Sequence, residues 1–309
     1  MKVLITGGTG FIGSHLIQKL HERGHHVNVI VKHSTRPFKL PDGVESITAD
    51  LLDIQGLKKI VRDYQPEVVC NLAAMTPVRF SFDNPFIYGQ TNYIGTMNMI
   101  FAAMESPILK KFVHASTAET YKPKDIPIKE TDELYGSTPY GVSKVAADYF
   151  VRVAGECYGL PYIVLRPSNT YGRKNERGYF IEKVITTMLT SKRLVLDGSP
   201  DVIRDWMYVD DHVQGYIRSI ESDVKNEVFN VSTGVQSTLG DTVEKIKSVM
   251  SWDGEVIWGN KPRPKDPKYL VLDNSKARQL LNFEPKYSLE KGFEETINWW
   301  RQELSKEVK

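Results

Sequence analysis

The sequence predicts an α/β fold in which a doubly wound parallel sheet carries helices on both faces and a smaller α/β lobe follows toward the C-terminus. Three observations indicate this class. An apolar strand pattern at 2–5 runs into a glycine-rich turn and then into a helical pattern at 11–23. Strand and helix patterns then alternate as far as residue 166, which is typical of parallel sheets. The chain has 309 residues, 41% of them hydrophobic, which is enough for one large domain or two modest ones.

The turn between the first strand and the first helix predicts a dinucleotide site of the Rossmann type. It contains three glycines with the spacing G-x-G-x-x-G at 8–13. Glycine permits a tight turn and a close approach of the backbone to a ligand, and the N–H groups at a helix start favour a pyrophosphate. An ordinary strand-to-helix turn is the alternative, but this motif directly follows a strand. The residues expected to line the cofactor are Gly7, Gly10, Phe11, Ile12 and Gly13.

The second strand, expected at 27–31, bears on the choice of cofactor. In an NAD-binding unit an acid at the end of this strand usually takes the ribose hydroxyls, but this chain has Val31 there. Lys32, Ser34 and Arg36 follow, and a segment with cations and hydroxyls suits a 2′-phosphate. A solvated basic turn is the alternative. We therefore expect NAD(P), with NADP modestly favoured over NAD.

The next two strands are expected to complete the cofactor site. The strand at 47–51 contains Asp50, whose carboxylate can accept a hydrogen bond from an adenine amino group. A helix at 57–64 precedes a strand at 68–74, which runs into Leu72, Ala73 and Ala74. Small side chains at that point let a cofactor lie against the backbone.

The segment after the fifth strand is the predicted catalytic region. This strand, at 112–116, ends in the run 116–121, and parallel sheets place their chemistry at the carboxyl ends of strands. A helix at 140–158 opens with Tyr140 and Lys144, which are four apart and share one face. A lysine ammonium stabilises a phenolate, so the pair can act as a general base toward an alcohol beside a nicotinamide, while Thr117 holds the same oxygen. An incidental Tyr and Lys at a helix start is the alternative.

The later chain is less regular. We expect a polar loop at 172–178, strands at 162–166 and 228–231, and helices at 180–189, 239–250, 275–281 and 288–303. The strand at 228–231 is expected to return to the main sheet. We predict that residues 1–168 form the NAD(P)-binding domain, with segments near 205–235 returning to it. Residues 169–309 are expected to form mainly the substrate-binding lobe.

The composition argues against several other classes of function. The formal net charge is only +2, from 40 basic and 38 acidic residues, which gives no argument for binding nucleic acid or a membrane surface. No apolar run approaches the length of a membrane span, and the first residues enter a strand at once, leaving no room for a signal peptide. Cys70 lies in an apolar strand pattern, so we expect it to be a core residue and not a metal ligand. The other cysteine, Cys157, is far away in the chain, and we expect no metal site. A cytoplasmic enzyme fits these properties.

Several motifs of the chain match those of a known family. Besides the glycine turn and the Tyr140–Lys144 pair, they are Asp50-Leu51 with Asp53, Leu72-Ala73-Ala74, Thr91-Asn92 with Gly95-Thr96, the runs 166–172 and 204–211, and Arg263-Pro264. With these motifs the chain resembles the extended short-chain dehydrogenases/reductases of the NAD-dependent epimerase/dehydratase type over nearly its whole length. The resemblance implies a nucleotide-diphosphate sugar as substrate, with a UDP-sugar favoured over a GDP- or dTDP-sugar. It also adds Leu51 and Asn92 to the expected cofactor site.

The resemblance implies roles for single residues as well. It makes Thr117, Tyr140 and Lys144 the catalytic set, and it makes Asn169, Arg204 and Arg263 the residues that grip the sugar nucleotide. Arginine pairs well with diphosphate oxygens, although a surface ion pair is the alternative for Arg204. The chain departs from the family at Asn71, where many members carry His.

Glu119 bears on the type of reaction. GDP-mannose and dTDP-glucose 4,6-dehydratases have Thr-x-Glu at this place, as in Thr117-Ala118-Glu119, whereas simple 4-epimerases usually have a small or hydroxyl residue. A glutamate can remove the C5 proton once C4 is a ketone. We therefore expect transient C4 oxidation followed by 4,6-dehydration or related elimination or oxidoreduction at C5 and C6. The alternatives are a 4-epimerase for a UDP-hexose or UDP-N-acetylhexosamine, with an idle Glu119, and a non-catalytic dinucleotide-binding regulator.

A homodimer is also expected. The helices at 86–104 and 140–158 carry apolar residues on more than one face, and one face must cover the sheet. The other can pair with a second copy, and relatives form dimers through a four-helix bundle of these helices. The expected contact residues are Phe86, Met97, Ile100, Tyr149 and Val153.

Overall fold

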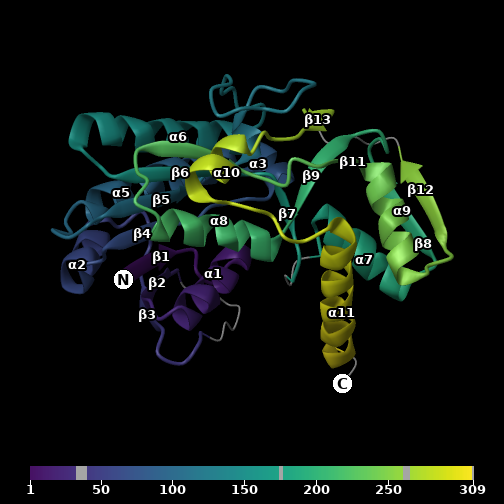
Figure 1. The fold of residues 1–309 in the computed structure, drawn as a ribbon, viewed down its shortest axis with the longest axis horizontal. Coiled ribbons are helices and arrows are strands. Elements are labelled where there is room, and N and C mark those ends of the chain that lie inside the picture. Colours follow the sequence, from purple (N-terminus) through teal and green to yellow (C-terminus); the bar gives the residue numbers. More distant parts are fainter. Residues whose placement is uncertain (33–39, 174–176, 260–264, 308–309) are drawn as a thin grey trace.

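A parallel sheet forms the centre of the protein in the computed structural model, which describes residues 1–32, 40–173, 177–259 and 265–307 (Figure 1). Seven strands of these residues follow the order β10-β6-β5-β4-β1-β2-β3, and each neighbouring pair is parallel. This is the order of a doubly wound dinucleotide-binding sheet with β10 added beside β6, so the predicted fold class is confirmed. The strands are β1 (Lys2–Thr6), β2 (His26–Val31), β3 (Glu45–Thr48), β4 (Val68–Asn71), β5 (Lys111–Ala115), β6 (Tyr162–Pro167) and β10 (Glu227–Val231).

Successive residues of the central strands enter two different hydrophobic cores. In β1, Val3 and Ile5 pack on the face that α1 and α8 cover, while Leu4 packs on the face of α2, α5 and α6. Because helices cover both faces, the strands are apolar almost throughout. The covering helices are α1 (Phe11–Glu22) and α8 (Val209–Glu221) on one face, and α2 (Ile54–Tyr64), α5 (Gly95–Ala103) and α6 (Pro139–Tyr158) on the other; α10 (Ser275–Leu281) contacts α8 and β10.

A second group of elements, which we call the small lobe, lies to one side of the main sheet, at the right of Figure 1. In it β9 pairs with β7, β11 and β13, and β8 pairs with β12. Its strands are β7 (Asn169–Tyr171), β8 (Arg193–Asp197), β9 (Ile203–Tyr208), β11 (Gln236–Thr238), β12 (Glu255–Gly259) and β13 (Tyr269–Leu270), and its helices are α7 (Phe180–Thr190), α9 (Leu239–Met250) and α11 (Leu289–Glu307). The chain enters this lobe three times, because α8 and β10 return to the main sheet between β9 and β11, and α10 packs against α8 and β10 between β13 and α11.

Two strands end earlier than predicted. The strand expected at 47–51 ends at Thr48, since the chain turns at Asp50, whose carbonyl accepts the N–H of Asp53. The strand expected at 68–74 ends at Asn71. Beyond it, the N–H of Ala73 donates to the side chain of Thr6 at 3.2 Å. After Thr48 a local turn replaces the ladder, whereas after Asn71 a side-chain hydroxyl of the neighbouring strand β1 takes the place of a backbone carbonyl.

The helix predicted at 86–104 is interrupted by a turn of π-helix. This continuous helical segment consists of α4 (Pro85–Tyr88), the π-helical turn η1 (Gly89–Ile94) and α5. It follows a short helix, α3 (Val78–Asp83). A π-turn holds one extra residue, so later residues are rotated by about 100° relative to an uninterrupted α-helix. Ile100, which we expected at a dimer surface, consequently lies in the core beneath α5, and that expectation is wrong.

The described residues contain no helix that is both long and apolar enough to cross a membrane. Within the same residues, no three or more His, Cys, Asp or Glu side chains are grouped so that they could hold a metal ion. Cys70 is fully buried in β4, which confirms its expected place in the core.

Candidate active site

The glycines between β1 and α1 form a cradle that larger residues cannot fit. Gly7 has a φ of +71°, and a Cβ there would lie 2.6 Å from the backbone nitrogen of Ala73. A Cβ on Gly13 would lie 2.3 Å from the carbonyl oxygen of Gly7. Gly10 is the N-cap of α1 and brings no side chain to cap its first turn, so the positive end of the helix dipole faces the cradle. The cradle therefore fits the pyrophosphate of a dinucleotide.

The end of β4 is fixed against this cradle by a buried amide. Asn71 accepts a hydrogen bond from the Thr6 hydroxyl at 2.8 Å and donates to the Thr96 hydroxyl at 3.0 Å. It also lies 3.3 Å from Nδ1 of His114. In this chain the residue that departs from the family pattern thus ties β1, β4 and α5 together and holds Leu72, Ala73 and Ala74 beside Gly7.

The residues expected around the adenosine are only partly described. Lys32 is 74% exposed, and its ammonium lies 2.9 Å from the carboxylate of Asp50. Asp50 also accepts the N–H of Leu52 at 3.0 Å. We expected Lys32 at the 2′-phosphate and Asp50 at the adenine. The two side chains form an ion pair, so their charges partly neutralise each other. Ser34 and Arg36 lie outside the described residues.

Asn92 lies in the π-turn and connects the cofactor side of the site to the catalytic helix. Its amide accepts the N–H of Met75 at 2.7 Å and donates to the carbonyl of Met75 at 3.0 Å. It also donates to the Ser143 hydroxyl at 2.9 Å, and Ser143 donates to the carbonyl of Tyr140 at 2.7 Å. Asn92, which we expected at the cofactor, is thus placed where it fixes the loop after β4 relative to α6.

Thr117, Glu119, Tyr140 and Lys144 come together at the carboxyl end of β5. Thr117 precedes the short 3₁₀ turn η2 (Ala118–Thr120) that carries Glu119. A Cβ on Gly141 would lie 2.9 Å from the carbonyl of Glu119, so the glycine lets this turn lie against the start of α6. Thr138 caps that start by accepting the N–H of Gly141 at 3.0 Å.

Burial sets the protonation of the two central groups. It raises the pKa of Tyr140, whereas the hydrogen bond with Thr117 lowers it and the nearby Glu119 and Tyr179 raise it further. Burial also lowers the pKa of Lys144 to about 8, against the opposing effect of Asp148. The ammonium of Lys144 donates to the carbonyl of Ala115 at 2.5 Å. At neutral pH the site therefore contains a protonated phenol one helical turn from a mostly charged lysine.

A buried ion pair supports these residues from behind. Asp148, one turn after Lys144 on α6, binds Arg166 of β6 through two contacts of 2.8 Å. Asp148 also accepts the Ser116 hydroxyl at 2.7 Å, and Arg166 donates to the Tyr121 hydroxyl at 2.8 Å. The pair thus holds both ends of the segment that carries Thr117 and Glu119, although we had assigned it no role from the sequence.

On the side of the small lobe, two of the expected substrate residues lie on paired strands. Asn169 of β7 stands opposite Trp206 of β9, and its buried side-chain oxygen has no hydrogen-bond partner among the described residues. Arg204, on the same strand as Trp206, is almost buried and donates to Asp266 at 2.7 Å and to the carbonyl of Pro267 at 2.9 Å. Arg263 lies outside the described residues.

Tyr179 is a residue of this site that the sequence did not indicate. It immediately precedes α7, and its hydroxyl lies 3.0 Å from the hydroxyl of Thr76, in the loop after β4. Its phenol is close enough to act on the pKa of Tyr140. The only available signal was its position between a polar loop and a helix, which does not show what the side chain meets.

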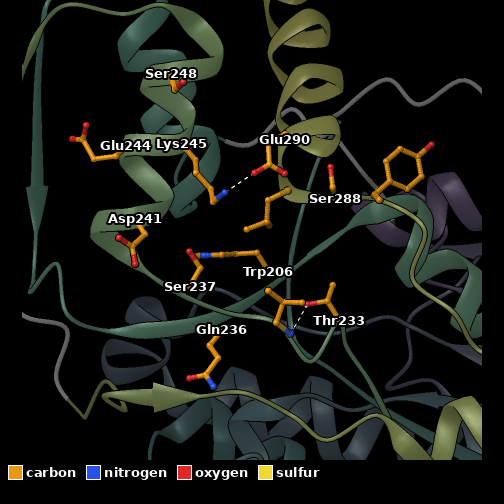
Figure 2. A pocket seen from close by; sticks show the side chains of 13 residues that line it. Trp206, Thr233, Gln236, Ser237, Asp241, Glu244, Lys245, Ser248, Ser288 and Glu290 are labelled. Carbon is orange, nitrogen blue, oxygen red and sulfur yellow. Dashed lines mark hydrogen bonds and ion pairs between the residues drawn. The ribbon is translucent and has the colours of Figure 1, made fainter.

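A cavity of about 630 Å³ lies elsewhere, between α9 and the start of α11 in the small lobe (Figure 2). Trp206 lies among its lining residues, and the ion pair of Lys245 with Glu290, at 2.5 Å, joins the two helices beside it. The described lining includes neither Tyr140 nor Thr117. This cavity therefore lies apart from the residues that we expect to be catalytic.

Comparisons with known proteins cover nearly the whole chain. A family model described as GDP-mannose 4,6 dehydratase matches residues 4–296. A putative UDP-glucose 4-epimerase of Methanocaldococcus jannaschii is 31% identical over an aligned length of 306, and the alignment covers 97% of this chain and 98% of that protein. The dTDP-glucose 4,6-dehydratase 1 of Escherichia coli is 29% identical over an aligned length of 335, gaps included, and the alignment covers 97% of this chain and 92% of that protein. The crystal structure of a UDP-glucuronic acid 4-epimerase from Bacillus cereus, in complex with UDP-glucuronic acid and NAD, has a TM-score of 0.90 at 29% identity and covers 98% of this chain and 99% of that one.

Proposed function

The chain belongs to the extended short-chain dehydrogenase/reductase family of nucleotide-sugar epimerases and dehydratases, and we propose that it oxidises C4 of a nucleotide-diphosphate sugar transiently and then acts at C5 and C6. The observation that carries the proposal is the meeting of Thr117, Tyr140 and Lys144 beside Glu119. A base for the C4 hydroxyl and a carboxylate for C5 then occur in one site. The Tyr–Lys pair speaks against a non-catalytic dinucleotide-binding regulator.

The cofactor that this reaction needs fits the residues present. Gly7, Gly10 and Gly13 leave space for a pyrophosphate at the start of α1, and the backbone of Leu72 and Ala73 lies against Gly7. When bound, a nicotinamide dinucleotide supplies the acceptor for the hydride that leaves C4 and returns the hydride before the product departs. We assign residues 1–168, with the returning segments near 205–235, to this cofactor and residues 169–309 mainly to the substrate.

Tyr140 is the proposed base for the C4 hydroxyl. Burial raises its pKa, so it needs a positive neighbour in order to take a proton, and Lys144 carries most of its charge at neutral pH. Thr117, hydrogen-bonded to the phenol, can hold the same sugar oxygen. Once C4 is a ketone, the C5 hydrogen is acidic and the Glu119 carboxylate can remove it. The C6 hydroxyl then leaves as water by taking up a proton, hydride returns to C6, and a proton from solvent adds to C5. The net change of this 4,6-dehydration is the loss of one water.

Asn169 and Arg204 are the proposed contacts to the substrate. The buried oxygen of Asn169, which has no partner within the part of the chain that the structure describes, can accept a hydrogen bond from a ligand donor. Arg204 lies on the neighbouring strand, and a guanidinium matches the oxygens of a diphosphate. Arg263 completes the proposed set. We favour a UDP-sugar, because the Bacillus cereus structure contains one, over a GDP- or dTDP-sugar.

The second candidate is a 4-epimerase. Two of the similar proteins reported above are named as 4-epimerases. In that reaction the ketosugar turns over in the site and receives hydride on the other face, so the C5–H bond never breaks and Glu119 takes no part.

Product analysis by NMR in D₂O separates the two candidates. We expect a UDP-, GDP- or dTDP-hexose to be converted with deuterium incorporated at C5. Glu119→Gln, which keeps the shape but removes the base, should abolish that label while C4 oxidation stays detectable. A lost general base typically costs about 10²–10⁴-fold in rate. Conversion by the wild-type enzyme without label at C5 would establish the 4-epimerase.

Tyr140→Phe tests the first step. It should suppress the initial oxidation by about 10²–10⁴-fold, since a phenyl ring cannot take the proton. Tyr158→Phe is the matched control, because Tyr158 is an exposed tyrosine at the far end of the same helix. Equal activity of Tyr140→Phe and the control would remove Tyr140 from the mechanism.

The cofactor preference is a finer proposal. Val31 replaces the usual acid and Lys32 is exposed beside it, which supports NADP modestly over NAD. Asp50 offsets part of this positive charge, so the preference should be small. Mass spectrometry of cofactor released from purified protein decides it: NAD alone would end the NADP preference, and a flavin would contradict the cofactor site.

We also infer a homodimer through the helices at 85–103 and 139–158. Phe86 is 84% exposed, and Tyr149 and Val153 of α6 are exposed as well, while Met97 is partly buried. Apolar side chains on the outer side of two neighbouring helices favour pairing with a second copy. Light scattering that gives a monomer at working concentration would reject this.

A further inference from the structure

Tyr179 reaches across from the small lobe to the main sheet. The Tyr179 and Thr76 hydroxyls lie 3.0 Å apart, although the two residues are 103 positions apart in the chain. Tyr179 lies at the N-cap of α7, but its side chain does not cap that helix. The contact thus joins the segment after β4 to the segment before α7.

The position of Thr76 relative to Tyr140 is set by a short series of hydrogen bonds. Asn92 binds both backbone groups of Met75, the residue before Thr76, and donates to Ser143. Ser143 in turn donates to the carbonyl of Tyr140. The Tyr179 hydroxyl is therefore held at a place that is fixed with respect to the catalytic phenol.

A second tyrosine, Tyr88, lies next to Tyr140. Tyr88 donates to the carbonyl of Pro77 at 2.5 Å, and its ring meets the ring of Tyr140 edge to face at 6.2 Å. Burial is the main cause of the raised pKa of Tyr88 and of Tyr140, and the nearby Tyr179 raises both pKa values further. The phenol of Tyr179, held at Thr76, thus lies near enough to Tyr140 to influence its pKa.

We propose that Tyr179 is a further substrate-positioning residue, whose hydroxyl hydrogen-bonds the hexose of the nucleotide sugar beside Tyr140. This inference rests on the proposed function, because it needs a hexose in that place. A phenol both donates and accepts, so its hydroxyl can serve a sugar hydroxyl and the Thr76 hydroxyl at once. Arg204 and Asn169 lie on β9 and β7, so the nucleotide and diphosphate have their own proposed contacts. Tyr179 should therefore act on the sugar and not on the nucleotide.

Binding of UDP and of UDP-glucose to the cofactor-loaded enzyme tests this by titration calorimetry. Tyr179→Phe should weaken UDP-glucose by about 3- to 10-fold, the effect of one hydrogen bond, and change UDP by less than about 2-fold. GDP with GDP-glucose, and dTDP with dTDP-glucose, are run in parallel. Tyr158→Phe is the matched control and should change neither ligand.

Thr76→Val separates positioning from a merely structural contact. It removes the partner but keeps the Tyr179 hydroxyl, so its loss of sugar-nucleotide affinity should be smaller than that of Tyr179→Phe. An equal or larger loss would show that the pair only joins the two segments and would overturn the inference. Unchanged UDP-glucose affinity in Tyr179→Phe, or an equal loss for UDP, would overturn it too. If the wild type binds none of the three nucleotide sugars, the proposed function fails first, and this inference with it.

Discussion

Two buried carboxylates, one behind the catalytic residues and one in the small lobe, are held in opposite ways. Asp148 of α6 and Asp205 of β9 are both 0% exposed. Asp148 faces the guanidinium of Arg166, also buried, at 2.8 Å. Asp205 accepts hydrogen bonds from uncharged groups, among them the hydroxyl of Thr233 at 2.6 Å and the N–H of Gly234 at 2.9 Å.

The partners decide the direction of each pKa shift. Burial alone raises the pKa of a carboxyl group, because the charged form loses its water. At Asp148 burial acts in that direction, but the hydrogen bonds and charge of Arg166 outweigh it and the pKa lies below its ordinary value. At Asp205 burial outweighs the neutral donors, and the pKa lies above its ordinary value. The protein therefore keeps a permanent charge pair beside the reacting residues, whereas the carboxylate in the small lobe mainly joins backbone segments.

Asp148→Asn should have the largest effect on stability. It leaves Arg166 buried without a counter-charge, which typically costs about 3–5 kcal/mol of the free energy of unfolding. The folded-state pKa of Asp148 is lowered, so its contribution is present above the unfolded pKa near ~3.9 and is lost as the pH falls through the folded value. Urea unfolding at pH 7 and at lower pH measures both effects.

The control for Asp148→Asn is Asp63→Asn, which removes a carboxylate from an exposed pair with Lys59 on α2 and should change stability little. A loss in Asp148→Asn no larger than in this control would contradict the role of the buried pair in holding the segment 116–121.

Asp205→Asn should cost less, about 1–2 kcal/mol at neutral pH. The amide oxygen can still accept from Thr233, but the amide nitrogen opposes the N–H of Gly234 and leaves that donor unsatisfied. The folded-state pKa of Asp205 is raised, so the wild type loses stability as the pH rises through that value. The cost of the substitution should therefore shrink with rising pH, whereas that of Asp148→Asn grows. Urea unfolding at several pH values measures the loss of stability in each variant. If the two losses changed with pH in the same direction, the comparison of Asp148 with Asp205 would be contradicted.

The catalytic half of the site was predictable because its signals are local. The glycine spacing at 8–13 specifies a cradle between two regular elements, and the four-residue spacing of Tyr140 and Lys144 specifies one helix face. Both depend only on neighbouring residues and on the period of a strand or a helix. The family match then supplied the class of substrate and cofactor.

The parts of the fold and of the site that the sequence did not predict depend on contacts between distant segments. The strands β7, β11 and β13 have two or three residues each, too short to show an alternating pattern. The π-turn at Asn92 is accompanied by partners at Met75 and Ser143, which no local pattern indicates. For the same reason the contact of Tyr179 with Thr76 appears only in the folded chain, and the identity of the sugar cannot be read from the sequence.

Lys111 is the cationic counterpart of Asp205, and its effect on stability should appear at alkaline pH. It is almost buried at the start of β5 and donates to the carbonyls of Ser219 and Ser222, at 2.7 and 2.5 Å. Burial lowers its pKa to about 8. Between about pH 8 and 10 the folded protein releases this proton before the unfolded chain does, so stability rises with pH.

We expect this rise to reach up to about 3 kcal/mol, since each unit of difference between the folded and unfolded pKa is worth about 1.4 kcal/mol, and to be missing in Lys111→Met. Urea unfolding of both proteins across this pH range is the measurement. A rise of the same size in the variant would assign the effect to other groups.

The smallest effect is expected at an ion pair on the surface of the small lobe. Lys245 of α9 and Glu290 of α11 are 43% and 51% exposed, so water and salt screen their attraction (Figure 2). Lys245→Ala should change the free energy of unfolding by less than about 0.5 kcal/mol, and the change should vanish at about 1 M salt. Asp148→Asn, whose charges are buried, should keep its cost in the same salt. Glu244→Gln, on the same helix, removes a neighbouring carboxylate and is the control. A salt-independent loss above about 1 kcal/mol in Lys245→Ala would show that this pair, like the one behind Tyr140, holds its helices in place.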